Sequence, residues 1–165
     1  MREFSIYRVF ILCKIQIDYE EFIALDDYNK KKVALELLMK GIRRVASDQK
    51  WSMIPFEEAY EEIVKANYVN RWVWQKSARN KETKMRARIL LCHEVKQIDI
   101  YMCIEDKKGN EVHKEKLITE RPSEWAYAGY LGSIYWESND KVVLRSKRED
   151  QEFVVNFLSN NHIDS

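Results

Sequence analysis

From residue 69 to residue 146 the apolar residues of this chain recur at every second position, in short runs separated by polar residues. This alternation is typical of β-strands that bury one face of a sheet. The sequence predicts six strands there, over 69–76, 84–92, 97–105, 111–118, 133–137 and 141–146. Two of the connections are short and polar, residues 106–110 and 138–140, and they predict tight antiparallel turns.

Before residue 69 the apolar period is helical. Asp26 and Asp27 can cap a helix in which four apolar residues recur at helical spacing before it ends near residues 46–48. These four residues are Leu35, Leu38, Ile42 and Val45. Pro55 is of a residue type favoured in the first helical turn, and it begins a second helix with Phe56 on its apolar face.

The two ends of the chain complete the expected order of elements. A first strand is predicted over 4–17, where β-branched and aromatic residues dominate. A closing helix is predicted from the apolar residues within 153–158, with the acids of residues 149–152 in its first turn. The sequence therefore predicts an α+β fold, mainly antiparallel sheet with two helices after the first strand and a C-terminal helix. With 165 residues and 45% hydrophobic content, the chain can bury one ordinary core, and we expect a single domain over 1–165.

Cysteine usage and hydropathy favour a reducing compartment. The three cysteines are an odd number without framework spacing, and the apolar run from Val9 to Cys13 is shorter than the apolar region of a secretory signal. The longest uncharged run, 125–136, contains two glycines and is shorter than a membrane helix requires. We expect a cytoplasmic protein that does not associate with membranes.

Charge is strongly segregated along the chain. The segment from Arg71 to Arg88 carries seven cationic side chains against one acid, Glu82, and so has a net charge of +6, against −5 for the remainder. A basic segment that also holds two tryptophans indicates a surface that meets a charged partner.

A hairpin centred on Asn80 is predicted to place these side chains on one face. Its directly opposed pairs are expected to be Trp72 with Arg88, Trp74 with Arg86, and Lys76 with Lys84. Such a platform suits nucleic acid, with bases stacked on indoles and cations on phosphates, or a protein partner anchored by Trp and Arg. The alternative is a plain solvent-facing sheet surface in which arginine stems cover the indoles.

The second helix is predicted to expose an acidic face. Glu57 with Glu61, and Glu58 with Glu62, are like-charge pairs at four-residue spacing, which destabilise an isolated helix. Either basic residues of the same molecule neutralise them, or the face captures a basic protein partner by electrostatic steering.

Catalytic and metal signals in the sequence are weak. Cys92, His93, Cys103 and His113 lack zinc-ligand spacing, and we predict no metal site and no cofactor. The triplet from Glu94 to Lys96 resembles an element of metal-dependent nucleases only if a second carboxylate, from Glu82 or Asp99, lies beside it. The aromatic and glycine-rich segment 125–136 is expected to form a corner of the core, with a recognition pocket as the alternative.

These observations favour a non-catalytic protein-binding module, of the immunity or inhibitor kind, that neutralises a toxin or nuclease through its charged surface. The predicted partner-binding residues are the four glutamates of the acidic helix face together with the tryptophans and arginines of the strand pair: Glu57, Glu58, Glu61, Glu62, Trp72, Trp74, Arg86 and Arg88. The alternative is a nucleic-acid-binding domain or a small metal-dependent nuclease that uses the basic and aromatic strand pair.

Overall fold

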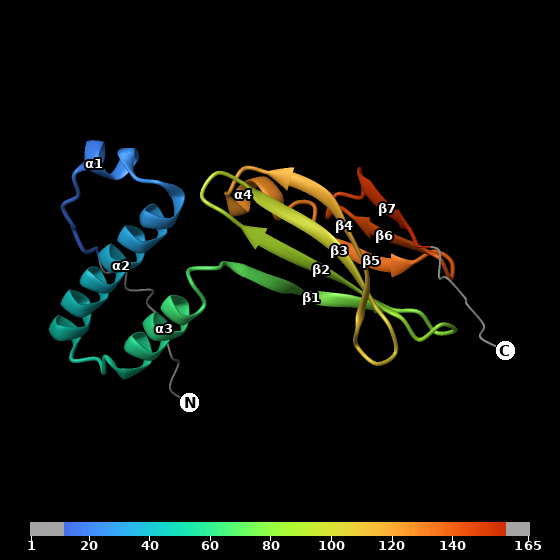
Figure 1. Cartoon of the computed structure of the whole chain (residues 1–165), viewed down its shortest axis with the longest axis horizontal. Coiled ribbons are helices and arrows are strands. Elements are labelled where there is room, and N and C mark those ends of the chain that lie inside the picture. Colours follow the sequence, from blue (N-terminus) through green and yellow to red (C-terminus); the bar gives the residue numbers. More distant parts are fainter. Residues whose placement is uncertain (1–11, 158–165) are drawn as a thin grey trace, which may run out of the picture. The chain divides into compact units, whose positions relative to one another are not determined.

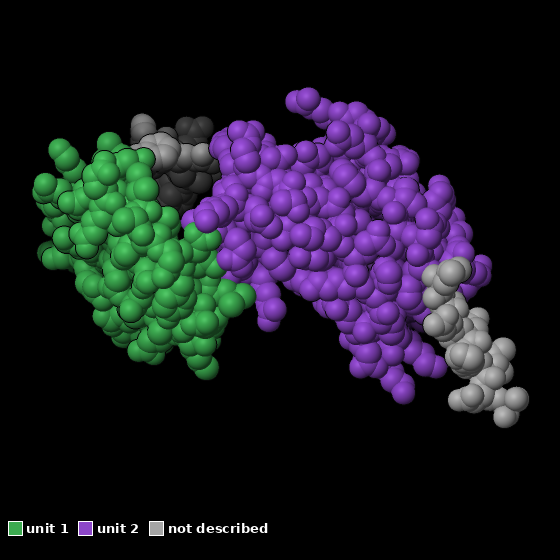
Figure 2. Space-filling view, turned by 45° about the horizontal axis from the view of Figure 1, so that its top comes forward, with its two compact units in different colours: residues 1–69 green, residues 70–165 purple. Residues whose placement is uncertain are grey.

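The computed structural model describes residues 12–157 and divides the chain into two compact units (Figures 1 and 2). We call residues 1–69 the helical unit and residues 70–165 the strand unit. Each unit has its own buried apolar cluster. A single domain over 1–165 stays a prediction.

The helical unit contains α1 (Tyr19–Ala24), α2 (Asp27–Gln49) and α3 (Ile54–Lys65). The side chain of Asp26 caps α2 by accepting a hydrogen bond of 2.8 Å from the backbone N–H of Asn29, and Pro55 lies in the first turn of α3. Both predicted helices are therefore confirmed. Their contact buries a small cluster from α2, α3 and the residues that follow α3: Leu35, Met39 and Tyr68, with Ile42, Met53, Phe56 and Tyr60 packed against them.

Two details of the helical unit differ from expectation. Residues 12–17 form no strand, and residues 4–11 of the predicted first strand lie outside the described residues. On α2, Met39 is buried while Leu38 is 58% exposed. The sequence pattern selected Leu38 because it lies at helical spacing from Leu35, but Met39 lies one full turn from Leu35 on the face that contacts Phe56 and Tyr60.

The strand unit consists of two sheets, and neighbouring strands within each sheet are antiparallel (Figure 1). The first sheet has the order β1-β2-β3-β4 and the second the order β5-β6-β7. Six of the seven strands correspond to the six predicted runs. The strands span β1 (Arg71–Arg79), β2 (Arg86–His93), β3 (Ile98–Glu105), β4 (Glu111–Glu120), β5 (Ser133–Trp136), β6 (Lys141–Arg145) and β7 (Glu152–Asn156).

The core of the strand unit lies between the two sheets. Every second residue of β2 and β3 points into it, which is why these segments alternate in the sequence. The opposing layer comes from β6, β7 and the short helix α4 (Glu124–Tyr127) with the residues after it. The fully buried side chains shared between the two layers include Ile89, Leu91, Ile98, Ile100, Met102, Ile104, Val142, Leu144 and Val155.

The predicted C-terminal helix is wrong, because residues 152–156 form the edge strand β7. Phe153 and Val155 pack into the core while Val154 between them is exposed, which is the alternation of a strand. The apolar spacing from 153 to 158 fitted a helix equally well, and pairing with β6 decided the outcome. The α+β class is confirmed, with three helices ahead of the sheets, the short helix α4 between β4 and β5, and no helix after β7 within the described residues.

Both predicted turns are confirmed. The carboxylate of Asp106 accepts hydrogen bonds of 2.8 Å and 2.9 Å from the backbone N–H groups of Lys108 and Asn110, and Gly109 adopts the positive φ of 91° that the turn requires. Residues 138–140 join β5 to β6, in a register that sets Trp136 opposite Val142.

Candidate functional site

The first candidate surface is the β1–β2 hairpin, and its register differs from the prediction. Trp72 lies opposite Leu91, and Ser77 lies opposite Arg88. The turn occupies residues 80–85, and β1 carries a bulge between Val73 and Ser77 that shifts its register by two residues. The alternation of apolar and polar residues in β1 gives no sign of this bulge, so the predicted hairpin had uninterrupted strand pairing.

The altered register separates the tryptophans from the arginines. Trp72 shares a face with the buried Leu91 and meets the ring of His93 edge-on at 6.1 Å, and Trp74 packs against the core. Arg86 and Arg88 point to the opposite face of the sheet, because they alternate with the buried Ala87 and Ile89. The predicted stacking of Arg88 on Trp72 and of Arg86 on Trp74 is therefore wrong.

Arg88 has a partner within its own sheet. Its guanidinium forms a salt bridge with Glu105, whose side chain is largely buried. Because Glu105 is occupied in this way, the arginine directly across from it, Arg86, is left without an acidic partner among residues 12–157.

The second candidate surface is the acidic face of α3. Glu57, Glu58, Glu61 and Glu62 are all exposed, and α3 buries none of its residues. Glu62 lies 3.5 Å from the ammonium of Lys65 in a solvent-exposed pair. The other three have no hydrogen bond or ion pair within the described residues of the helical unit. Neutralisation of this face by the basic strands of the same molecule stays a prediction.

The eight predicted partner-binding residues do not come together within one unit. The four glutamates belong to the helical unit, whereas Trp72, Trp74, Arg86 and Arg88 belong to the strand unit. Within the strand unit, the two tryptophans and the two arginines lie on opposite faces of one sheet.

The residues considered for catalysis or metal binding either lie far apart in the strand unit or are held in other interactions. The triplet from Glu94 to Lys96 forms the β2–β3 turn, where the backbone N–H of Glu94 donates to Gln97 O at 2.8 Å, and Glu82 lies in the turn at the other end of β2. The described residues contain no group of three or more His, Cys, Asp or Glu side chains able to hold a metal ion. Burial, aided by Glu111, raises the pKa of Cys103 to about 12, so this thiol is protonated at neutral pH and is not an activated nucleophile.

Asp99 lies at the centre of a polar cluster on the outer face of the first sheet. It accepts hydrogen bonds from Thr119 at 2.5 Å and from Gln97 at 3.0 Å, and the ammonium of Lys116 lies 3.3 Å away. Burial acts to raise the pKa of Asp99, but the hydrogen bonds and Lys116 together hold it below its ordinary value. This arrangement is that of a structural carboxylate that ties β3 to β4.

Replacing Asp99 by asparagine is expected to flatten the acid limb of the stability curve. A carboxyl whose folded-state pKa is depressed contributes stability above its unfolded pKa of about 3.9, and that stability is lost as the pH falls through the lower folded value. The measurement is urea unfolding of the wild type and Asp99→Asn at a series of pH values from neutral into the acid range. Equal pH slopes for the two proteins would contradict the assignment.

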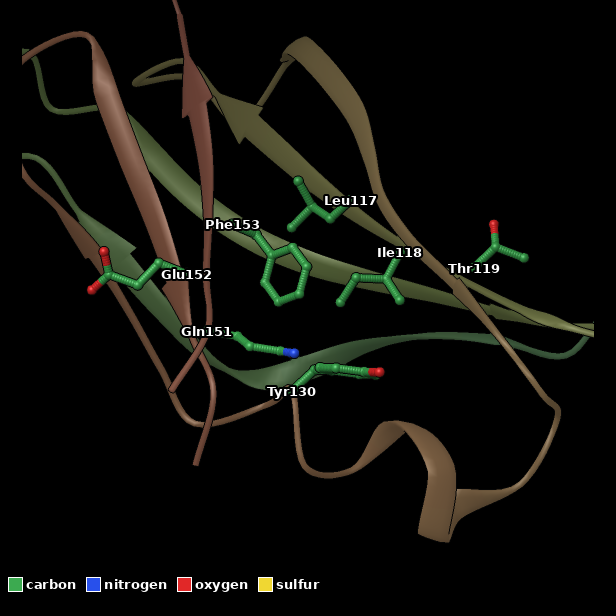
Figure 3. A pocket seen from close by; sticks show the side chains of 7 residues that line it. All are labelled: Leu117, Ile118, Thr119, Tyr130, Gln151, Glu152 and Phe153. Carbon is green, nitrogen blue, oxygen red and sulfur yellow. The ribbon is translucent and has the colours of Figure 1, made fainter. Parts of the chain in front are cut away.

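One pocket opens between β4 and β7, with a volume of about 480 Å³ (Figure 3). Leu117, Ile118 and Phe153 give it an apolar lining, and Gln151 points toward its centre. The remaining polar lining residues are engaged, because Thr119 binds Asp99, the Tyr130 hydroxyl donates to Glu120 and Glu152 binds Arg145. Its lining suits packing more than catalysis.

The structure also gathers cations that the sequence did not place together. Arg86 lies directly opposite Glu105, so the β1–β2 turn and the β3–β4 turn project from the same end of the first sheet. Their basic residues form what we call the cationic end, which consists of Arg79, Lys81, Lys84, Arg86, Lys107 and Lys108. The high lysine content of residues 81–84 and 107–108 was the available signal, but only the pairing of β2 with β3 brings the two turns together.

The aromatic segment 125–136 forms a corner of the core, as expected. Tyr127 and Leu131 are buried in it, and Trp136 packs against it while its indole N–H donates to Ala78 O at 3.2 Å. Trp125 is the exception, because its side chain is almost fully exposed.

Comparison of the chain with protein-family models, with curated proteins and with solved structures gives no match. None of the helices within residues 12–157 has the combination of length and hydropathy that a membrane span needs.

Proposed function

We propose that this chain is a non-catalytic protein-binding module whose α3 face takes up a basic protein partner. The observation that carries the proposal is that Glu57, Glu58 and Glu61 stand exposed on one helix without an ion pair among the described residues of the helical unit. Like charges at this spacing destabilise a helix by a few tenths of a kcal/mol per pair, a cost that a cationic partner offsets on binding.

Apolar side chains beside the glutamates support a protein partner over simple solvation. Ile54 and Val64 of α3 are both exposed, the first of them to 64%. Protein interfaces combine an apolar centre with a charged rim, and these two aliphatic residues give the acidic face an apolar component. A toxin or nuclease with a cationic active-site cleft is the class of partner that fits, in a cytoplasmic setting.

Charge reversal on α3 tests the proposal. The variant Glu57→Lys/Glu58→Lys/Glu61→Lys/Glu62→Lys should fold, because none of these side chains is buried, but it should lose the partner. We expect affinity capture from lysate of the source cells, followed by mass spectrometry, to yield a basic protein with the wild type and not with the variant. The association rate constant of the identified pair should fall by about tenfold or more at low salt.

A control with the same change in charge is available elsewhere on the chain. Glu20, Glu21, Asp48 and Glu124 are exposed and can be replaced together by lysine. Capture of the same partner by the wild type and by both variants, in equal amounts, would remove the α3 face from consideration. Loss with both variants would show only that total charge matters.

A further inference from the structure

The cationic end of the strand unit places six basic side chains at two neighbouring turns, which also carry the acids Glu82 and Asp106. None of the six basic residues forms an ion pair with a carboxylate among the described residues of the strand unit. The ammonium of Lys84 donates to the backbone carbonyl of Lys81 at 2.6 Å, which holds the Lys84 side chain over the β1–β2 turn. The side chains of Lys107 and Lys108 project from the β3–β4 turn, whose shape is fixed by Asp106 and Gly109 and not by the lysines.

Four of the acids at this end of the sheets have polar partners outside the cationic end, whereas Glu111 is exposed at the start of β4. Glu82 accepts a hydrogen bond of 2.5 Å from the Asn139 amide, and Asp106 accepts from Asn110. Glu137 is paired with Lys141, and Glu105 with Arg88. Each of these carboxylates therefore has a nearer or better aligned partner than the cations of the cationic end.

Two arginines of the cationic end face each other across the hairpin. Arg79 is the direct cross-strand partner of Arg86, and both are exposed on the same face of the sheet. Like charges in this position destabilise a strand pair. An anion that lies over both guanidinium groups would offset this repulsion.

A hollow of about 450 Å³ adjoins the cationic end. Arg79, Lys81 and Asn139 line it together with Tyr135 and Trp136, and with the acids Glu82 and Glu137, which are bound by Asn139 and Lys141. The side chain of Asn80 makes this hollow rigid, because its oxygen accepts from the backbone N–H groups of Glu82 and Thr83 at 2.9 Å and 3.0 Å while its amide donates to Ser138 O. The turn that carries Lys81 is thus held against the β5–β6 turn.

We propose that the cationic end binds the phosphate backbone of a nucleic acid, with the hollow beside it accommodating a base. A nucleic-acid strand carries a charge on every nucleotide, and so it can engage cations that are spread over two turns of the sheet. Aromatic rings beside the cations suit a base, which an acidic peptide does not offer. This site shares no residue with the acidic face of α3, so a test of nucleic-acid binding does not decide whether α3 binds a protein partner.

Binding of fluorescein-labelled oligonucleotides to the full chain, measured by fluorescence anisotropy, tests the proposal. The probes are a single-stranded DNA of about 20 nucleotides, the RNA of the same sequence and the DNA duplex, each titrated between about 50 and 200 mM NaCl. We expect a single strand to bind with a slope of log affinity against log salt near −4, since each of six phosphate contacts contributes about −0.7. Lys107→Glu/Lys108→Glu should weaken binding by about tenfold or more and reduce the slope by about 1.4.

The β6–β7 turn supplies the matched control. Lys147 and Arg148 are exposed, lie at the other end of β6 and form no ion pair within the described residues, so Lys147→Glu/Arg148→Glu changes total charge equally. This variant should bind within about twofold of the wild type at equal salt. Lys81→Glu, on the other turn of the cationic end, should also weaken binding. It serves as the second test if the Lys107→Glu/Lys108→Glu variant does not fold.

Three results would overturn the proposal. The first is no binding of any of the three probes at about 50 mM NaCl, where contacts to phosphate are strongest. The second is an equal loss of affinity in the control variant, which would reduce the effect to net charge. The third is displacement of the labelled strand by polyglutamate at the same charge concentration as unlabelled DNA, which would assign the surface to an acidic protein.

Discussion

Ile100→Ala is expected to lower the free energy of unfolding of the strand unit by about 3 to 4 kcal/mol, within the range measured for removing a large aliphatic side chain from a packed core. Ile100 is fully buried in the middle of β3, with Leu91 opposite it on β2 and Ile118 opposite it on β4. The cavity left by this substitution would lie in the centre of the first sheet. The neighbouring strands β2 and β4 are both hydrogen-bonded to β3, so they cannot move inward to fill it.

Urea unfolding followed by tryptophan fluorescence measures this loss. Four of the five tryptophans, Trp72, Trp74, Trp125 and Trp136, lie in the strand unit and report its unfolding. Val112→Ala is the control, because Val112 is 44% exposed on β4 and its truncation should change stability by no more than about 0.5 kcal/mol. A loss below about 1 kcal/mol for Ile100→Ala would mean that the two sheets do not share the core described above.

Gly132→Ala is expected to cost about 3 kcal/mol or to prevent the strand unit from folding, because the added methyl group meets backbone and not flexible side chains. A Cβ atom at residue 132 would stand 2.5 Å from the carbonyl oxygen of Arg145 and still closer to that of Ser146. The backbone N–H of Gly132 donates to Arg145 O at 3.1 Å, so this close approach is part of the start of the β5–β6 pairing.

Gly129→Ala provides the comparison three residues earlier. A Cβ atom there meets no heavy atom within 4 Å, and Gly129 is exposed, so its replacement should be nearly neutral. Circular dichroism and urea unfolding of the two variants under the same conditions measure the difference. Equal stabilities would show that residues 145 and 146 can move away from β5 without cost.

The strands of the second half were predictable because one physical cause, the burial of a single sheet face, sets both the sequence pattern and the structure. Ile98, Ile100, Met102 and Ile104 alternate in the sequence for the same reason that they meet in the core. The strand β7 was missed because two aromatic and two β-branched residues within six positions satisfy a helical and an extended pattern alike. Tertiary pairing with β6 resolved this ambiguity.

The candidate site was less predictable than the fold, because it depends on register. The bulge between Val73 and Ser77 leaves no mark in the alternation, yet it decides which residue lies opposite Arg88. The acidic residues of α3 could be placed on an exposed face from spacing alone, since a single helix needs no register. The cationic end needed the pairing of β2 with β3, which brings together two turns whose lysines lie more than twenty positions apart in the sequence.

Of the four edge strands of the two sheets, β4 and β7 differ in how well they resist self-association. β4 places Lys114, Glu115 and Lys116 at the middle of its ten residues, and charges in that position discourage another chain from extending the sheet. The five-residue edge β7 has an exposed Val154 at its centre and no charge between Glu152 and Asn156. Where the molecule is heated or concentrated, intermolecular strand addition should therefore begin along β7, and a lysine in place of Val154 is the substitution that would guard this edge.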